Sequence, residues 1–329
     1  MANQFTVSRR AMLALTAAAA LGAMAPQGAM AQAWPNGSVQ LIVPARAGGG
    51  TDAAARILAA ALQENTGQPF VVVNNPGGGG VVAAETVRTA APDGQTLLFF
   101  HSGILAMHHT GAYEANPLDS FTTAVTMPVG GSYALAVAAD SPYQTVDDLV
   151  QASIASPNSL SMGVQVRGST HFMAGLLMMD SGAQFRIVDA GSDADKLVQL
   201  QGGQIAAAMI NTSGTMQYVE SGALRILATI GGTPERDAGA ADIPSLAELG
   251  YANAVYGLDF LIMGPTGMDP AVVSAIHDAF TVVIDTPAIA EQFETMRMPL
   301  TSLPLDAVQP RLVETDARVS ATATLLELN

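Results

Sequence analysis

The chain has 329 residues and a formal net charge of −15, with 28 acidic side chains against 13 basic ones and no cysteine. This acidic balance argues against a nucleic-acid partner, because phosphate backbones are bound by basic surfaces. The lack of cysteine excludes disulfides, thiolate nucleophiles and cysteine-ligated zinc. The same charge repels anionic solutes at long range, so an anion would have to be held by local amides and the few arginines.

Residues 1–31 have the pattern of an export signal. Arg9 and Arg10 precede an apolar stretch, and an A-x-A motif ends at Ala31, after which we predict cleavage and a periplasmic location. Removing the two arginines and no acidic residue changes the charge from −15 to −17. The run 8–13 is similar to a twin-arginine export motif but lacks its usual Phe, so the Sec route stays open. An uncleaved anchor is the alternative, although the stretch is shorter than the ~20 residues of a membrane span.

From residue 39 to residue 100 the apolar pattern alternates between strands and helices. Short apolar runs predict strands at 39–43, 70–73 and 96–100, and one buried face predicts a helix that begins near Ala53. Right-handed βαβ crossovers would join these strands into a parallel sheet. The loops that follow them would then open on one edge, which is where open α/β sheets bind ligands.

A second cycle of alternation predicts a second domain. Apolar runs predict strands at 160–162, 185–188, 205–210 and 225–230 in this cycle, and a further strand at 258–263 after it. Helices are predicted at 146–155, 171–181, 193–201 and 214–221. Thr145 and Asp148 form a capping-box-like pair, and Asp269 and Thr286, each followed by proline, mark two further helix starts.

The glycine-rich turn 44–52 is the most informative motif, because it joins a strand to the start of a helix. Backbone N–H groups at a helix start lack intrahelical partners and lie at the positive end of the helix dipole, so such a turn binds anions. Arg46 could bind a carboxylate through two paired hydrogen bonds, or its side chain could be exposed to solvent. Asp52 could cap its own helix or accept a hydrogen bond from a ligand.

Three further loops follow predicted strands in the same way. Residues 167–171 repeat the glycine turn with hydroxyl side chains, which could bind a ligand or cap the next helix. Ser102 follows one strand and Asn211 follows another. The glycines at 77–80 suit a tight turn and do not match a dinucleotide fingerprint.

The sequence carries no strong signal for catalysis or for a cofactor. His101, His108 and His109 would align on a helix, but no carboxylate lies nearby before Glu114, which disfavours a metal site. Neither a G-x-S-x-G nor an H-E-x-x-H motif is present. We therefore expect no enzyme activity, no metal and no cofactor.

In order and spacing, motifs along nearly the whole mature chain resemble the extracytoplasmic solute receptors of the tripartite tricarboxylate transporter family, the TctC or Bug receptors. The motifs lie at 34–35, 41–44, 48–52, 67–77, 91–94, 141–142, 168–171, 202–204, 224–228 and 243–250. The resemblance implies an α/β, two-lobed periplasmic binding protein of type 2, in which each lobe is a mostly parallel sheet with flanking helices and the ligand cleft lies between the lobes. It places residues 32–135 and 256–329 in the first lobe and 136–255 in the second, with hinges near 133–137 and 254–258.

The resemblance also implies the function and the site. Such receptors capture a small organic anion, a mono- or dicarboxylate, and deliver it to the membrane subunits of the transporter; they resemble monomers. The family's ligand-contacting positions fall on Arg46, Ala47, Gly48, Gly49, Gly50, Thr51, Asp52, Ser102, Gly103, Arg167, Gly168, Ser169, Thr170, His171 and Asn211.

Departures from the family pattern concern the ligand. Arg46-Ala47 replaces a common Ala-Pro, Asn211 replaces a common Asp, and 188–191 lacks a lysine that Arg46 or Arg167 could replace. Two other functions remain open: a receptor for a membrane sensor kinase, and a periplasmic hydrolase that would turn its ligand over.

Overall fold

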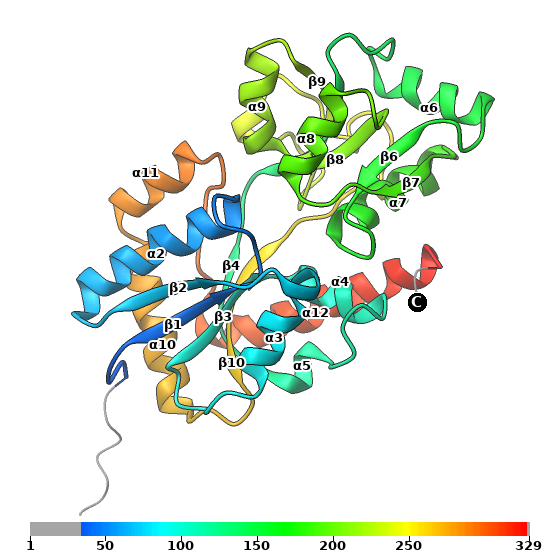
Figure 1. Ribbon diagram of the computed structural model, residues 1–329. Coiled ribbons are helices and arrows are strands. Elements are labelled where there is room, and N and C mark those ends of the chain that lie inside the picture. The colour runs from blue at the N-terminus through cyan, green and yellow to red at the C-terminus, as the bar shows by residue number, and fades with distance from the viewer. Residues whose placement is uncertain (1–33, 328–329) are drawn as a thin grey trace, which may run out of the picture.

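The computed structural model describes residues 34–327, so the predicted export signal 1–31 lies outside the described residues. Two five-stranded sheets form two lobes, and helices flank each sheet. Figure 1 shows the lobes one above the other, joined by two extended segments of chain. The predicted α/β, two-lobed architecture is therefore confirmed.

The first sheet has the strand order β2-β1-β3-β10-β4. Its strands are β1 (Val39–Val43), β2 (Phe70–Asn74), β3 (Thr96–His101), β4 (Phe121–Pro128) and β10 (Asp259–Pro265). β1 pairs in parallel with β2 and β3, whereas β10 is antiparallel to both β3 and β4. Four strands thus share one direction, and the strand that returns from the second lobe runs against them.

Helices cover both faces of the first sheet. The helices on one face are α2 (Gly50–Thr66), α10 (Pro270–Ile284) and α11 (Pro287–Thr295). Those toward the other face are α3 (Val81–Arg88), α4 (Gly103–His109), the short α5 (Pro117–Ser120) and α12 (Leu305–Leu325). The glycines at 77–80 form a 3₁₀ turn before α3 in which Gly78 and Gly79 have positive φ, as the prediction of a tight turn requires.

The second sheet has the order β7-β6-β8-β5-β9. Its strands are β5 (Ser132–Ala138), β6 (Ser161–Val164), β7 (Arg186–Asp189), β8 (Ala207–Asn211) and β9 (Leu224–Gly231). The reversed strand is β5, which is antiparallel to β8 and β9. The helices that flank this sheet are α6 (Val146–Ala155), α7 (Ser169–Ser181), α8 (Asp193–Gln201) and α9 (Thr212–Glu220).

The predicted helices are confirmed, although α2, α7 and α9 begin two or three residues earlier than predicted. Thr145 and Asp148 form a reciprocal capping box at α6, and α10 and α11 begin directly after Asp269 and Thr286. The helix predicted near Ala53 begins three residues earlier, at Gly50. The glycines suggested a loop, but Gly50 adopts helical backbone. Of the three glycines 48–50, only Gly48 has a positive φ.

The chain crosses between the sheets twice. It leaves β4 at Pro128 and enters β5 at Ser132, and it returns through Tyr256 and Leu258 into β10. Residues 133–137, where the sequence suggested a hinge, lie inside β5 and are hydrogen-bonded to both neighbouring strands. The crossing at 129–131 is therefore the irregular segment, and it contains two consecutive glycines.

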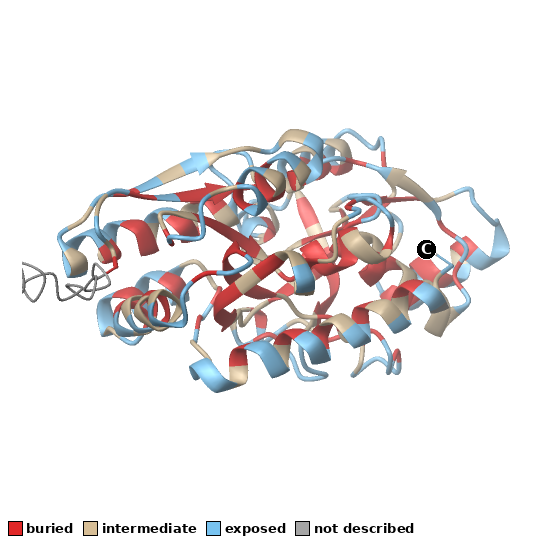
Figure 2. Ribbon diagram, turned by 90° about the horizontal axis from the view of Figure 1, so that it is seen from below, coloured by how far each residue is buried: buried red, intermediate tan, exposed pale blue. Residues whose placement is uncertain are grey.

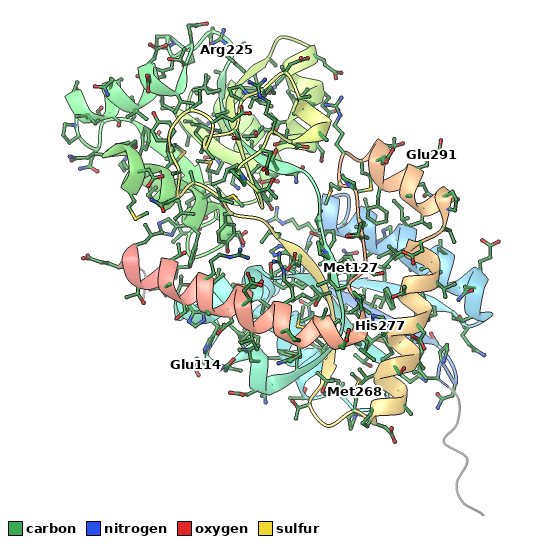
Figure 3. The ribbon with its side chains drawn as sticks, turned by 180° about the vertical axis from the view of Figure 1, so that it is seen from behind. Glu114, Met127, Arg225, Met268, His277 and Glu291 are labelled. Carbon is green, nitrogen blue, oxygen red and sulfur yellow. The ribbon has the colours of Figure 1, made fainter. Side chains whose placement is uncertain are left out.

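The C-terminal helix α12 was not foreseen and contacts both lobes. It packs along β4 and α4 of the first lobe and reaches α7 of the second. Figure 3 shows it crossing the back of the molecule, from the lobe that holds Met127 and His277 toward the lobe that holds Arg225. At its end Leu326 lies against Gly175, where an added Cβ would meet the leucine side chain at 2.5 Å.

The sheets are the most buried part of the molecule, and the helices expose only their outer faces (Figure 2). Apolar side chains of both lobes join in one cluster through α4 and α7. Among residues 34–327 no single helix has the length and apolar character of a membrane span, although the bent pair α10 and α11, at 72°, meets that criterion jointly by length and composition alone.

Candidate functional site

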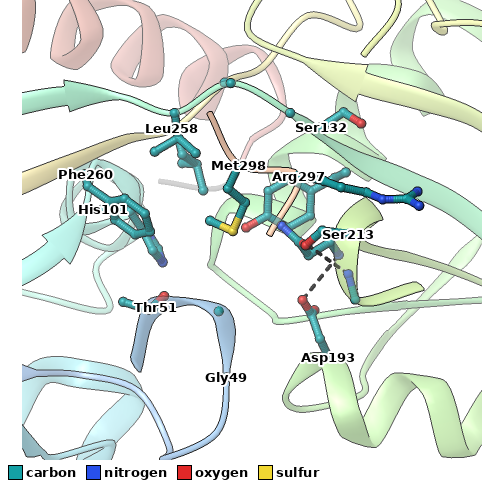
Figure 4. Close-up of a pocket in the computed structure, with 18 of the residues that line it drawn as sticks. Gly49, Thr51, His101, Ser132, Asp193, Ser213, Leu258, Phe260, Arg297 and Met298 are labelled. Atoms are coloured by element: carbon teal, nitrogen blue, oxygen red, sulfur yellow. Dashed lines mark hydrogen bonds between the residues drawn. The ribbon is translucent and has the colours of Figure 1, made fainter. Parts of the chain in front are cut away.

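A cavity of about 420 Å³ lies between the lobes and is walled by both of them (Figure 4). The first lobe contributes 48–51, His101, Phe260, Arg297 and Met298. The second lobe contributes 132–133, 193–194, Leu197, Asn211, 213–214 and 217–218. The crossing segments 129–131 and 256–258 close the cavity on the remaining side. Its volume suits a small organic molecule.

Three helices begin at this cavity. The starts of α2, α8 and α9 contribute Gly50, Asp193 and Ser213 respectively to its wall. The first N–H groups of each helix have no intrahelical acceptor and carry partial positive charge. The cavity therefore gathers backbone donors from both lobes, which is an arrangement that stabilises an anion.

Of the predicted site residues in the first glycine turn, Gly48, Gly49, Gly50 and Thr51 line the cavity. Their contact with a solute stays a prediction. Arg46 and Ala47 are not part of the lining, because the turn directs them outward to solvent, where both are exposed.

Asp52, although predicted at the ligand, lies beneath the turn and is only 3% exposed. Its Oδ2 accepts hydrogen bonds from the Gly48 amide at 2.8 Å and from Arg56 at 3.0 Å, and its Oδ1 accepts from Asn74 at 2.9 Å. Burial alone would raise the pKa of the Asp52 carboxyl, but these hydrogen bonds outweigh burial and lower it. Asp52 thus fastens the turn to β2 instead of facing the cavity, because its acceptor sites are taken by the chain itself.

His101 ends β3 and lies on the cavity wall, with its ring pointing toward Thr51 in Figure 4. Burial lowers the pKa of the His101 imidazole to about 4, an effect that nearby Asp193 partly offsets. Its Nδ1 accepts the backbone N–H of Gly103 at 3.1 Å. In the neutral ring Nε2 therefore carries the proton, which makes His101 a hydrogen-bond donor at neutral pH.

Asn211, the one predicted second-lobe residue on the cavity wall, caps α9. Its Oδ1 accepts from Ser213 Oγ at 2.6 Å and from the Gly214 amide at 3.3 Å. The side-chain oxygen thus caps the helix, and the Nδ2 amide remains a donor.

The other predicted residues lie outside the cavity lining. Ser102 Oγ accepts the amide of Asp259 at 3.1 Å, which ties the end of β3 to β10. Gly103 begins α4, tightly packed against the His101 ring and Ser169 Oγ, so its lack of a side chain serves packing.

The segment 167–171 lies at the contact between the lobes, beside α4 and outside the cavity wall. The carbonyl of Arg167 accepts from Thr110 Oγ1 of the first lobe, and the amide of Arg167 donates to His171 Nδ1. Thr170 Oγ1 accepts the Gln165 amide, so this hydroxyl holds its own turn, while Ser169 is buried and Gly168 is the N-cap of α7. The glycine turn thus joins the lobes through the Arg167 carbonyl.

The sequence did not single out four polar side chains of the wall, Tyr133, Asp193, Tyr256 and Arg297. Burial raises the pKa of Tyr256 to about 12, and burial together with the charge of Asp193 raises that of Tyr133, so both phenols stay protonated. Asp193 begins α8 shortly after β7 ends at Asp189, so the rule that selected the other loops would also have found it. Arg297 follows α11 in a positive-φ position that no local pattern announces.

Within residues 34–327 no group of three His, Asp or Glu side chains is placed to hold a metal ion. His108 and His109 are used elsewhere: His108 Nδ1 lies 3.2 Å from the Tyr113 carbonyl, and His109 Nε2 lies 2.7 Å from Asp316 Oδ1.

Comparisons with known proteins agree with this architecture. A family model described as "Tripartite tricarboxylate transporter family receptor" matches residues 54–306. A Cupriavidus necator protein, "UPF0065 protein in gbd 5'region", is 32% identical over 299 residues, covering 91% of this chain and 90% of the relative. Protein BugT of Bordetella pertussis is 29% identical over 266 residues, covering 80% and 81% of the two chains.

Solved structures are similar over the same length. R. palustris Rpa4515 with adipate has a TM-score of 0.81 at 25% identity and covers 89% of this chain and 98% of its own. The periplasmic binding protein BugD has a TM-score of 0.79 at 21% identity, with 90% and 99% covered, and shows the same fold. The resemblance seen in the sequence motifs is thereby confirmed. The chain belongs to the tripartite tricarboxylate transporter receptor family and is a solute-binding protein, not an enzyme.

Proposed function

We propose that this protein is a periplasmic receptor that captures a small organic anion carrying a carboxylate and delivers it to the membrane subunits of a tripartite tricarboxylate transporter. The observation that carries the proposal is the interlobe cavity into which the amides at the starts of α2, in the first lobe, and α9, in the second, open. Export with cleavage after Ala31 and a monomeric state belong to the same proposal.

The amide donors fit a carboxylate held by several weak contacts. Micromolar binding corresponds to about −8 kcal/mol, whereas one charge at a helix start contributes ~0.3–1 kcal/mol. Several donors from both lobes must therefore act together, along with neutral His101 and protonated Tyr133 and Tyr256. Only a closed arrangement of the lobes brings all of them to one solute, so the solute itself drives closure.

The similarity to Rpa4515 with adipate supports the carboxylate class. Adipate is a dicarboxylate of a size that a cavity of about 420 Å³ accommodates. Family membership supports delivery to a transporter.

A thermal-shift screen of the mature protein against mono-, di- and tricarboxylates tests the proposal, followed by calorimetry with the best acid. We expect at least one acid to bind with micromolar or tighter affinity and to be recovered unaltered by mass spectrometry. A Gly49→Val variant, which adds a side chain to the cavity wall, should weaken binding at least tenfold.

Gly37→Val is the matched control, because Gly37 has open space around its Cα and lies outside the cavity. It should bind like the wild type. A chain that binds no organic acid, or that converts the acid it binds, would refute the receptor function proposed here. N-terminal sequencing of exported protein checks cleavage after Ala31.

A further inference from the structure

The two ends of the cavity differ in charge. The first-lobe end presents donors: the amides at the start of α2, the Thr51 hydroxyl and the His101 Nε2 proton. The second-lobe end presents a carboxylate, Asp193, at the first position of α8 (Figure 4). An ionised carboxylate only accepts hydrogen bonds, so a solute group that binds at this end must be a hydrogen-bond donor.

Asp193 is held in place and still open to the cavity. Its Oδ1 accepts from Lys196 Nζ at 3.1 Å, and its Oδ2 accepts from the backbone N–H of Asn211 at 3.2 Å. Its side chain remains 41% exposed, although it lines the cavity wall. Since a carboxylate offers about four lone-pair sites, two contacts leave acceptor capacity for a ligand.

Lys196, the only lysine of the chain, does not reach the solute. The residue is 1% exposed and lies behind the cavity wall, with Nζ bonded to Asp193 and 3.5 Å from Thr170 Oγ1. A buried ammonium requires a paired anion, so the contact with Lys196 fixes the position of the Asp193 carboxylate. This lysine therefore supports an acceptor and supplies no cation to a second carboxylate.

Arg297 is the cation on the described wall, and it is partly engaged. Its Nη1 donates to the Gly239 carbonyl at 3.2 Å, and its Nη2 lies 3.4 Å from Glu220. It adds to the donors available for a solute carboxylate. Asp193 remains the charged acceptor of the wall, and it would repel a carboxylate placed against it.

We propose, building on the receptor function above, that the solute is a carboxylate that also carries a hydroxyl or ammonium donor, and that Asp193 selects it by accepting from that donor. The solute lies with its carboxylate at the start of α2 and its donor against α8. Unsubstituted acids and dicarboxylates of the same length lack the donor and bind more weakly. A hydrogen bond to a charged group contributes about 1.5–3 kcal/mol, which corresponds to a preference of roughly tenfold or more.

Calorimetry with matched acids tests this selection. The probes are butanoate, pentanoate and hexanoate, each compared with its ω-hydroxy, ω-amino, 2-hydroxy and 2-amino derivatives and with the dicarboxylate of the same length. For the wild type we expect one donor-bearing acid to bind at least tenfold more tightly than its unsubstituted parent and the dicarboxylate. Asp193→Asn should reduce the preference for an amino acid to below threefold. It should reduce the preference for a hydroxy acid by a smaller factor, because the amide oxygen of Asn still accepts a hydrogen bond.

Asp193→Asn leaves Lys196 buried without its anion, so the double variant Asp193→Asn with Lys196→Met keeps the test valid if the single variant unfolds. Asp189→Asn, which removes the same charge from an exposed position outside the cavity, should keep the wild-type preference.

The selection by Asp193 is refuted if the dicarboxylate or the unsubstituted acid binds as tightly as its substituted forms, or if the folded variants keep the full preference. In either case the receptor function stands, since acids still bind. If none of the acids in this or the broader screen binds, the receptor function fails and the selection fails with it.

Discussion

Arg46 of the first lobe and Asp195 of the second lobe approach each other across the interlobe gap, with Nη1 and Oδ2 3.9 Å apart. Their side chains are 74% and 44% exposed, so water screens the pair. The contact exists only while the lobes are close together. Arg46, chosen from the sequence as a partner for the solute, is thus positioned to favour the closed state.

Replacing Arg46 by Gln should weaken solute binding only slightly. Exposed ion pairs contribute ~0.2–1 kcal/mol, so we expect an affinity loss of up to about fivefold that shrinks at high salt. Calorimetry at two salt concentrations measures it. Asp195→Asn, which keeps an oxygen to accept the Ser192 amide and cap α8, should have the same effect, and the double variant should add nothing. A larger loss for Arg46→Gln that does not depend on Asp195 would show instead that Arg46 binds the solute directly.

Asp52→Asn should reduce both stability and affinity. The amide can replace only part of the hydrogen bonding from Gly48 and Arg56, so we expect a loss of about 1–3 kcal/mol in the free energy of unfolding. The loosened turn should then bind solute several-fold more weakly, as calorimetry on the folded variant can measure. Unchanged stability and affinity would contradict this role.

The effect of Asp52 should also depend on pH. Its pKa is lower in the folded protein than the usual 3.8, so its contribution to stability is full above that value and is lost as the pH falls through the folded pKa. The difference in melting temperature between wild type and Asp52→Asn should therefore be constant near neutral pH and shrink below about pH 4. A difference that persists at the lowest pH would exclude ionisation as its cause.

His101 should remain an uncharged donor across the physiological range. With a folded pKa of about 4 against an ordinary 6.5, it contributes stability that is full above pH 6.5 and is lost as the pH falls toward 4. Solute affinity should accordingly show no His101-dependent step between pH 8 and pH 5. His101→Gln, whose amide still donates, should bind within a few-fold of wild type, whereas His101→Leu should lose about tenfold. Equal affinities for the two variants would remove His101 from the site.

Gly257→Ala should destabilise the returning crossover. An added Cβ would lie 2.5 Å from the Gly232 Cα, and backbone on both sides leaves nothing flexible to move. We expect a loss of about 1–3 kcal/mol in denaturant unfolding. Gly214→Ala, at another cavity-lining glycine with open space around it, is the control and should be close to neutral. Equal stability of both variants would show that the segments around Gly232 and Gly257 can move apart without loss of stability.

Local signals in the sequence predicted much of the fold. The apolar runs at 39–43 and 225–230, the capping box at Thr145 and the proline-marked helix starts were all recovered because each depends on neighbouring residues alone. The pairing of β10 with β3 and β4, and the position of α12 across both lobes, depend on contacts distant in sequence. No periodicity encodes those contacts.

The rule about strand ends predicted Gly48 to Thr51 and Asn211 as site residues, and these line the cavity, although their contact with a solute stays a prediction. The same rule also selected Asp52 and Thr170, whose polar atoms are satisfied within the chain, because spacing cannot show which way a side chain turns. Arg297 was missed for the opposite reason: it reaches the cavity from an irregular segment after a helix.

The burial of Lys196 has a practical consequence for chemical labelling. In a chain with one lysine and no cysteine, the folded protein offers amine-selective reagents almost nothing beyond its amino terminus, and thiol-selective reagents find no native target. Acylation of Lys196 would thus report the moments when α8 lifts from its neighbours. A single engineered cysteine on each lobe would accept a fluorophore pair free of background, so that opening and closing could be followed one molecule at a time.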